Sequence, residues 1–189
     1  MKLEFTIEGT SDLMTHNPIS MFMNGSGKPG KAKKEPTREE VAELACYRLA
    51  DGSCAVPVLA PRGAMIEAAK SFKLKGSRSS LGALLTGCEV EPMEHVPIMR
   101  DGKPVTEYVI DSRRAVNKNT KGAIIVHRPK FAAGWRITFS IILDDGLFKI
   151  SDEEVRETLT EVLNDAGMRK GIGSYRPAKG GWFGRFKVV

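Results

Sequence analysis

Two segments of the chain alternate strictly between apolar and polar residues. In residues 2–8 the apolar side consists of Leu3, Phe5 and Ile7. The same alternation returns in residues 135–143, and a period of two is that of a strand with one buried face. The apolar positions of this second segment are Trp135, Ile137, Phe139, Ile141 and Leu143. The pattern therefore predicts two half-buried strands.

Other segments have the spacing of capped amphipathic helices. Thr37 with Glu40, and Ser151 with Glu154, each have the spacing of a capping box. After Ser151, Gly167 is placed to end the helix in the left-handed conformation. The apolar stripe of that helix is Val155, Leu159, Val162, Leu163 and Ala166.

A third helix is predicted after a short buried strand at residues 54–60. Pro61 follows that strand, and proline suits the first turn of a helix because its missing N–H has no partner there anyway. The apolar face of this helix is Met65, Ala68, Ala69 and Phe72. The sequence therefore predicts a helix over residues 61–72.

The order of these elements indicates an α+β fold. The strand at 135–143, the helix after Ser151, the glycine-rich loop at 171–181 and a last strand within 182–189 form one half of a ferredoxin-like sheet. The first strand and the helix at 61–72 can supply the other half. We therefore expect a ferredoxin-like (RNA-recognition-type) antiparallel sheet with helices on one face and loop insertions.

We expect residues 1–189 to form a single domain, because the length suits one domain with large insertions. One insertion is a basic segment at 24–36, in which glycine, proline and lysine dominate, so we expect it to be flexible. The other is an irregular basic region of loops and hairpins at 73–121.

Charge is distributed unevenly along the chain. The chain has 29 lysines and arginines against 23 acidic residues, which gives a formal net charge of +6. Residues 152–165 are acidic, whereas cations cluster in 70–78, 113–136 and 168–189. A single basic cluster fits an ordinary solvated surface. Three of them favour a surface that binds a polyanion.

The sequence lacks the motifs of a metal site or of a common catalytic centre. The three histidines, His16, His95 and His127, have no metal-ligand spacing. Residues 25–31 match a phosphate-binding GxxxxGK pattern, but Ala32 stands where a magnesium-binding hydroxyl is required. We therefore expect no metal, no cofactor and a function by binding.

Cysteine usage and hydropathy indicate a cytoplasmic protein of a bacterium or of a phage-infected host cell. Cys46, Cys54 and Cys88 form neither a disulfide framework nor a CxxC unit, and free thiols fit a reducing compartment. We also expect no membrane association, because no apolar run approaches the length of a membrane span.

The glycine-rich loop is the most informative stretch for function. Its glycines leave backbone N–H groups able to approach a phosphate, and Arg176 and Lys179 add positive charge. Tyr175 and Trp182 offer flat faces on which bases can stack. The same residues equally fit a turn that closes a sheet with its aromatic residues in the core. Both interpretations remain open at the level of the sequence.

Three stretches resemble the RAMP superfamily (repeat-associated mysterious proteins). They are EFTIEGTSDLMTHNP at 4–18, VPVLAPRGAMIEAAKSF at 56–72 and GIGSYRPAKGGWFGRFKV at 171–188. Within the superfamily they are similar to the CRISPR backbone subunits that line up along a guide RNA. The match covers both ends of the chain, and the chain is shorter than typical backbone subunits, which fits a phage- or prophage-encoded relative.

The resemblance implies a ferredoxin-like, RNA-recognition-type domain and a glycine-rich loop near the C-terminal strand. It assigns Gly171, Gly173, Gly180 and Gly181 to that loop. It also implies that residues 61–65 open the helix that lies near the nucleic acid in the backbone subunits.

These observations predict a protein that binds single-stranded RNA or DNA with little sequence preference and forms a homo-oligomer along the strand. The expected contacts are Arg62, Lys70, Lys73, Arg113, Arg114, Arg128, Gly171, Gly173, Arg176, Lys179 and Arg185. Two alternatives remain: a RAMP-like endoribonuclease in which His16 is the general base or acid, and a phage assembly protein whose basic face contacts another protein.

Overall fold

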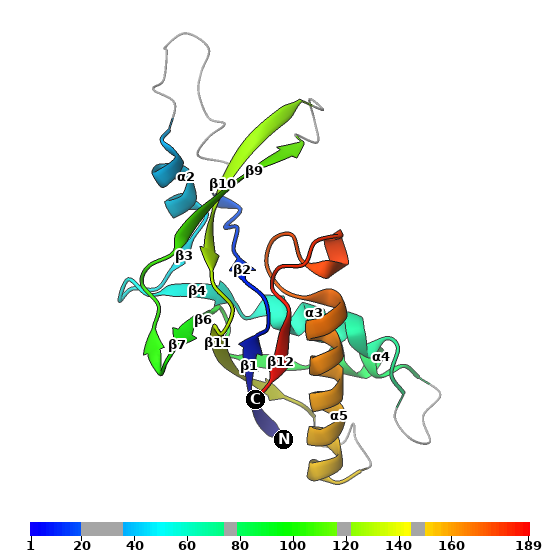
Figure 1. Ribbon diagram of the computed structural model, residues 1–189. Coiled ribbons are helices and arrows are strands. Elements are labelled where there is room, and N and C mark those ends of the chain that lie inside the picture. The colour runs from blue at the N-terminus through cyan, green and yellow to red at the C-terminus, as the bar shows by residue number, and fades with distance from the viewer. Residues whose placement is uncertain (20–35, 74–78, 117–121, 145–149) are drawn as a thin grey trace.

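The centre of the protein is an antiparallel sheet (Figure 1). In it, β1 (Lys2–Gly9) lies between β11 (Arg136–Ile142) and β12 (Phe186–Val188), and β11 also pairs with β5 (Glu89–Glu91). These four strands are β1, β5, β11 and β12 in chain order. The fourth, β12, lies beside the first, and the third, β11, lies between the first and the second. The computed structural model describes residues 1–19, 36–73, 79–116, 122–144 and 150–189.

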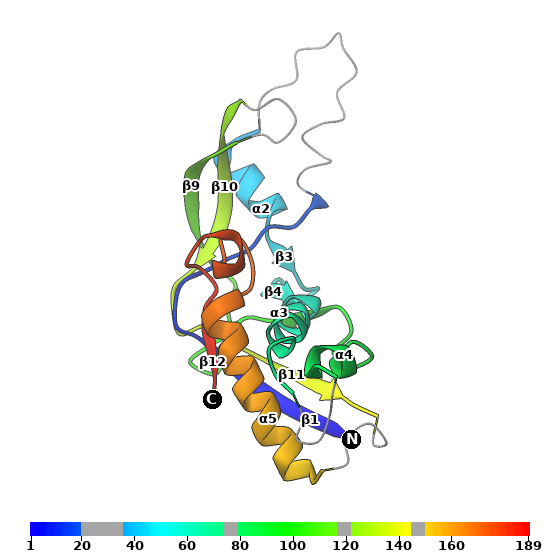
Figure 2. The same ribbon diagram turned by 90° about the vertical axis from the view of Figure 1, so that its right-hand side faces the viewer.

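Two helices cover one face of this sheet. α3 (Leu59–Ala69) lies between β1 and β5 in the sequence, and α5 (Asp152–Asp165) connects β11 to β12 (Figure 2). Side chains from both helices join the same buried cluster as the inner face of the sheet. This arrangement of strands and helices confirms the predicted ferredoxin-like α+β fold.

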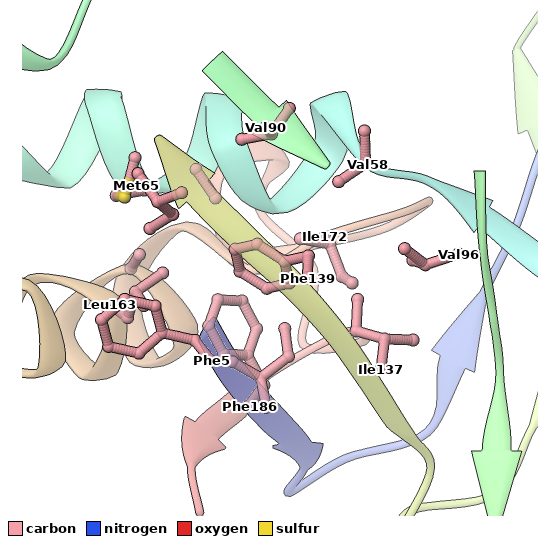
Figure 3. Close-up of a cluster of buried hydrophobic side chains, with 14 of the residues drawn as sticks. Phe5, Val58, Met65, Val90, Val96, Ile137, Phe139, Leu163, Ile172 and Phe186 are labelled. Carbon is pink, nitrogen blue, oxygen red and sulfur yellow. The ribbon is translucent and has the colours of Figure 1, made fainter. Parts of the chain in front are cut away.

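The alternating residues of β1 and β11 form the floor of the core. Phe5, Ile137 and Phe139 point to the side on which Met65 of α3 and Leu163 of α5 lie (Figure 3). All five are at most 3% exposed. Burial of each such side chain contributes roughly 1.5–3 kcal/mol, so this layer is a large part of the stability.

Both predicted capping boxes are present. The Thr37 hydroxyl accepts from the backbone N–H of Glu40 at 3.2 Å, at the start of α2 (Arg38–Leu44). The Ser151 hydroxyl accepts from the backbone N–H of Glu154 at 3.3 Å, at the start of α5. Each box satisfies amides that the first helical turn leaves without an internal acceptor.

The C-terminal end of α5 differs from the prediction. The helix continues through a π-helical turn, Ala166–Lys170, and Gly171, with φ of 64°, ends it. Gly167 is therefore not the left-handed terminator that the sequence suggested. It is needed for close packing instead, because a Cβ at this position would lie 1.9 Å from the carbonyl oxygen of Phe186.

The strand predicted at 54–60 is shorter than expected. It ends at Pro57, and α3 begins at Leu59, two residues before the predicted start, so Pro61 lies in the first helical turn as expected, at its third position. The remaining elements are β2 (Leu13–Met14), β3 (Tyr47–Arg48), β4 (Cys54–Pro57), α4 (Leu81–Leu85), β6 (His95–Pro97), β7 (Met99–Arg100), β8 (Lys103–Pro104), β9 (Val109–Val116) and β10 (Ala123–Phe131).

A long hairpin of β9 and β10 extends away from the central sheet in both views (Figures 1 and 2). Its base is joined to the rest of the protein by β2, which pairs with Lys130 and Phe131. The segment predicted to be flexible, 24–36, lies outside the described residues apart from Pro36.

Candidate nucleic-acid interface

The glycine-rich loop packs against the short strand β2. The backbone N–H of Ser174 donates to the carbonyl of Met14 at 2.7 Å, and that of Gly184 donates to Asp12 at 2.7 Å. Gly173 has φ of 74°, and a Cβ on it would lie 2.4 Å from the Met14 oxygen, so only glycine allows this approach. The loop is thereby held at the base of the β9–β10 hairpin.

The expectation of bare loop amides is wrong for much of the loop. The N–H groups of Ile172, Gly181 and Phe183 donate to carbonyls of Gly184, Arg176 and Tyr175. These bonds close the loop on itself, as the sheet-closing interpretation implies. Its capacity to bind an anion therefore depends mainly on side chains.

Two arginines of the hairpin meet the ring of Tyr175. The guanidinium carbon of Arg113 lies 4.9 Å from the ring centroid, and that of Arg128 lies 5.0 Å from it. Arg113 also lies 4.7 Å from the ring of Phe183. Tyr175 has φ of 52°, a backbone region that a residue with a side chain rarely adopts. Such strain is common at functional sites.

The charge of Arg113 is compensated by a carboxylate. Its Nε and one terminal nitrogen donate to the two oxygens of Asp111 at 2.5 and 2.7 Å. The hydrogen bond to Asp111 raises the pKa of Arg113, and the same bond lowers the pKa of Asp111. This forked pair fixes the guanidinium over the aromatic rings.

Arg128 lacks such compensation. Its Nε is buried and has no hydrogen-bond partner among the described residues, and no ion pair joins it to a carboxylate there. Burial lowers the pKa of Arg128, and the nearby Arg113 lowers it further, whereas Tyr175 and the charge of Asp111 raise it. A guanidinium stays protonated in proteins, so this site holds a poorly solvated positive charge with an unused donor.

Two adjoining cavities form a groove between the start of α3 and the glycine-rich loop. One cavity of about 250 Å³ is lined by His16, Tyr47 and Ser174 among others. An adjoining cavity of about 190 Å³ continues toward Glu67 and Lys170. The two cavities share Ala60, Ile172, Gly173 and Arg176. Burial lowers the pKa of His16, and Arg128 adds to this shift, so the imidazole is neutral at pH 7.

The structure brings several predicted contact residues together at this groove and its rim. They are Arg113, Arg128, Gly171, Gly173 and Arg176. Arg176 is half-buried, and its guanidinium donates to the carbonyl of Gly173 at 3.0 Å. It does not pair with Asp165, which binds Arg169 at 2.6 Å. Lys179 is exposed in the short 3-10 helix Pro177–Lys179.

Other predicted contacts lie elsewhere. Arg62 donates to the carbonyls of Thr86 and Cys88 at 2.7 and 3.1 Å, so it fastens α3 to the segment before β5. Lys70 pairs with Glu67, and Lys73 lies beyond the end of α3. Arg114 alternates with Arg113 along β9 and so lies on the opposite face of the hairpin, and Arg185 is exposed next to β12.

Sequence reasoning missed two residues of the cluster. Asp111 stands two positions before Arg113, the spacing that puts both on one face of a strand, and this was the available signal. Phe183 belongs to the cluster because the loop folds back on itself. The local sequence pattern does not indicate this fold of the loop. Within the described residues there is no group of three potential metal ligands.

No family model and no curated protein matches the sequence. Among solved structures, the chain is similar over its whole length to a chain from the "Type III-B Cmr-beta bound to cognate target RNA", with a TM-score of 0.50 and 11% sequence identity. The chain spans 58% of the length of that solved chain. At this level of identity the likeness concerns the fold alone, and it agrees with the α+β fold expected from the sequence. Among the described helices, none has the length and apolar character to cross a membrane.

Proposed function

We propose that the protein binds single-stranded nucleic acid, RNA in particular, where the base of the β9–β10 hairpin meets the glycine-rich loop. One observation carries this proposal: Arg113 and Arg128 flank the ring of Tyr175, and the buried Nε of Arg128 has no partner among the described residues. A phosphate oxygen at the terminal nitrogens of this half-buried guanidinium would neutralise its charge.

Aromatic side chains at the loop give the site a means of holding bases. Trp182 is 62% exposed and stacks on Phe183 with ring centroids 5.5 Å apart, so its outer face is available. Stacking of a base on such a ring contributes about 1–3 kcal/mol and tolerates any base. Arginines contact phosphates without reading sequence, so we expect little sequence preference.

The choice of RNA over DNA rests on the solved relative in fold, whose complex is bound to target RNA. A relative of the CRISPR backbone subunits, encoded by a phage or prophage, would fit such a role. The groove along α3 has the small residues Ala60, Gly63 and Gly173 on its walls, which leaves room for a sugar–phosphate chain.

We expect several copies to bind side by side on one long strand. A small site gains little affinity alone, and adjacent binding raises the effective concentration of each further copy. Sedimentation of the protein with a short and a long oligonucleotide tests this. Complexes on the long strand should contain several copies, and a complex with one copy only at saturating protein would rule out the assembly.

Replacement of Lys179 with glutamate tests the binding surface itself. Lys179 is exposed, so the variant should bind every single-stranded RNA more weakly, irrespective of sequence. The slope of log affinity against log salt should fall by roughly 0.7 for each lost phosphate contact. The free energy of unfolding should change by no more than about 0.5 kcal/mol.

Lys103→Glu is the matched control, because Lys103 is also exposed but lies in β8, at the opposite edge of the central sheet from β12. It makes the same change in net charge. We expect it to retain wild-type affinity at physiological salt. Equal loss of affinity in both variants would mean that net charge, and not contact at the loop, governs binding.

A further inference from the structure

Two thiols face each other at the β3–β4 hairpin. The sulfur atoms of Cys46 and Cys54 are 3.7 Å apart, with the Cys46 thiol as donor to the sulfur of Cys54. Cys46 directly precedes β3, and Cys54 is the first residue of β4. The two residues are 5% and 0% exposed. The site lies outside the cluster around Tyr175.

An arginine is fixed beside this pair of thiols. A terminal nitrogen of Arg48 lies 3.3 Å from the sulfur of Cys54 and also donates to the carbonyl of Thr106 at 2.6 Å. The other side of the guanidinium donates to both carboxylate oxygens of Glu43 at 2.8 and 2.9 Å. These bonds hold a positive charge next to sulfur, which favours the thiolate.

The pKa values of the two thiols are shifted in opposite directions. The hydrogen bond from Cys46 is the main cause that lowers the pKa of Cys54, and the Arg48 charge contributes. The same hydrogen bond raises the pKa of Cys46, together with burial. Cys54 is thus the more nucleophilic sulfur, and Cys46 is the thiol placed to react with it next.

We propose that Cys46 and Cys54 are a redox-active dithiol that closes to an intrachain disulfide when a peroxide reaches it. The thiolate of Cys54 attacks one peroxide oxygen, the O–O bond breaks, and the departing hydroxide takes up a proton to form water. The sulfur of Cys46 then attacks the resulting sulfenic acid. An S–S bond forms, and the S–O bond breaks with release of a second water that carries the proton of Cys46. The peroxide gains the two electrons that the thiols lose.

The register of the hairpin indicates that this disulfide is easily reduced again. Cys54 pairs with Arg48, so Cys46 is its diagonal neighbour on the same face. Diagonal neighbours have Cα atoms about 7–8 Å apart, whereas disulfides usually join Cα atoms about 4.4–6.8 Å apart. Closure therefore pulls the hairpin inward, and a strained disulfide of this kind is labile to thiols.

Peptide mapping of the native, full-length chain tests the proposal. The protein is treated with hydrogen peroxide, the remaining thiols are alkylated in denaturant, and the peptides are identified by mass. We expect linked peptides containing Cys46 and Cys54 with the loss of two hydrogens, and a return of both thiols with dithiothreitol. Cys88 is the internal control, since it is also 5% exposed and burial raises its pKa.

The proposal is tested by comparing the rate of disulfide formation with the rate of Cys88 oxidation. The Cys46–Cys54 link should form at least about tenfold faster than any oxidation of Cys88, because Cys46 and Arg48 lower the pKa of Cys54, whereas burial raises the pKa of Cys88. In a Cys46→Ser variant, Cys54 should instead be trapped as a sulfenic acid by dimedone. A link that forms only in urea, or no faster than Cys88 reacts, would overturn the proposal. Wild-type mapping alone gives this answer if the variant does not fold.

Discussion

Replacement of Arg128 with methionine is expected to weaken RNA binding by at least about tenfold, or about 1.4 kcal/mol. The same variant should be as stable as the wild type or more stable. The reason is that the folded protein buries a guanidinium without a carboxylate partner and with an unsatisfied Nε. An apolar side chain of similar length removes this cost and gives up a cation–π contact with Tyr175, which contributes about 0.5–1 kcal/mol.

The matched control is Arg156→Met. Arg156 also lies over an aromatic ring, with its guanidinium carbon 5.4 Å from the centroid of Phe5, and it donates to the carbonyl of Glu4 at 3.2 Å. It belongs to α5, which lies below the β9–β10 hairpin in Figure 2. Affinity for single-stranded RNA and urea unfolding are measured on both variants. Normal binding by Arg128→Met together with lower stability would show that Arg128 is part of the scaffold.

Substitution of Gly167 by alanine should cause a large loss of stability. A Cβ at this position would lie 1.9 Å from the carbonyl oxygen and 2.7 Å from the carbonyl carbon of Phe186. These are backbone atoms of β12, so the last strand must move away from the end of α5. We expect a loss of more than about 3 kcal/mol, or failure to fold, as for severe overpacking.

Gly87→Ala is the control for this prediction. Nothing lies within 4 Å of a Cβ at Gly87, and its φ is not in the left-handed region. Its free energy of unfolding should stay within about 0.5 kcal/mol of the wild type. If urea midpoints of the two variants were equal, close packing between Gly167 and β12 would not be what requires glycine there.

The sequence predicted those elements whose residues divide clearly between core and solvent. β1 and β11 alternate because one face is buried, and the capping boxes at Thr37 and Ser151 are local in the chain. The role of Gly167 could not be found in this way, because its neighbour Phe186 is distant in sequence. A glycine near a helix end has the same local pattern whether it terminates the helix or admits a neighbouring backbone.

The β9–β10 hairpin was harder to predict, because it has no single buried face. Val116 and Ile125 are 60% and 69% exposed, so apolar and polar residues do not alternate there by burial. The candidate site was predicted as separate basic clusters. Arg113 and Arg128 meet at Tyr175 because β2 holds the loop against the hairpin. These contacts join segments distant in sequence, so no local sequence pattern predicts them.

The position of β1 between β11 and β12 has a consequence for the order of folding during synthesis. Its register joins Ile7 to Ile137 on one side and to Val188 on the other. Among the described residues, the first strand therefore has no sheet partner until residues 136–142 have left the ribosome. Pairings this distant in sequence close slowly, and Leu3, Phe5 and Ile7 remain open to aggregation or to chaperones in the meantime. Overproduction at low temperature, which slows synthesis and aggregation, should raise the soluble yield.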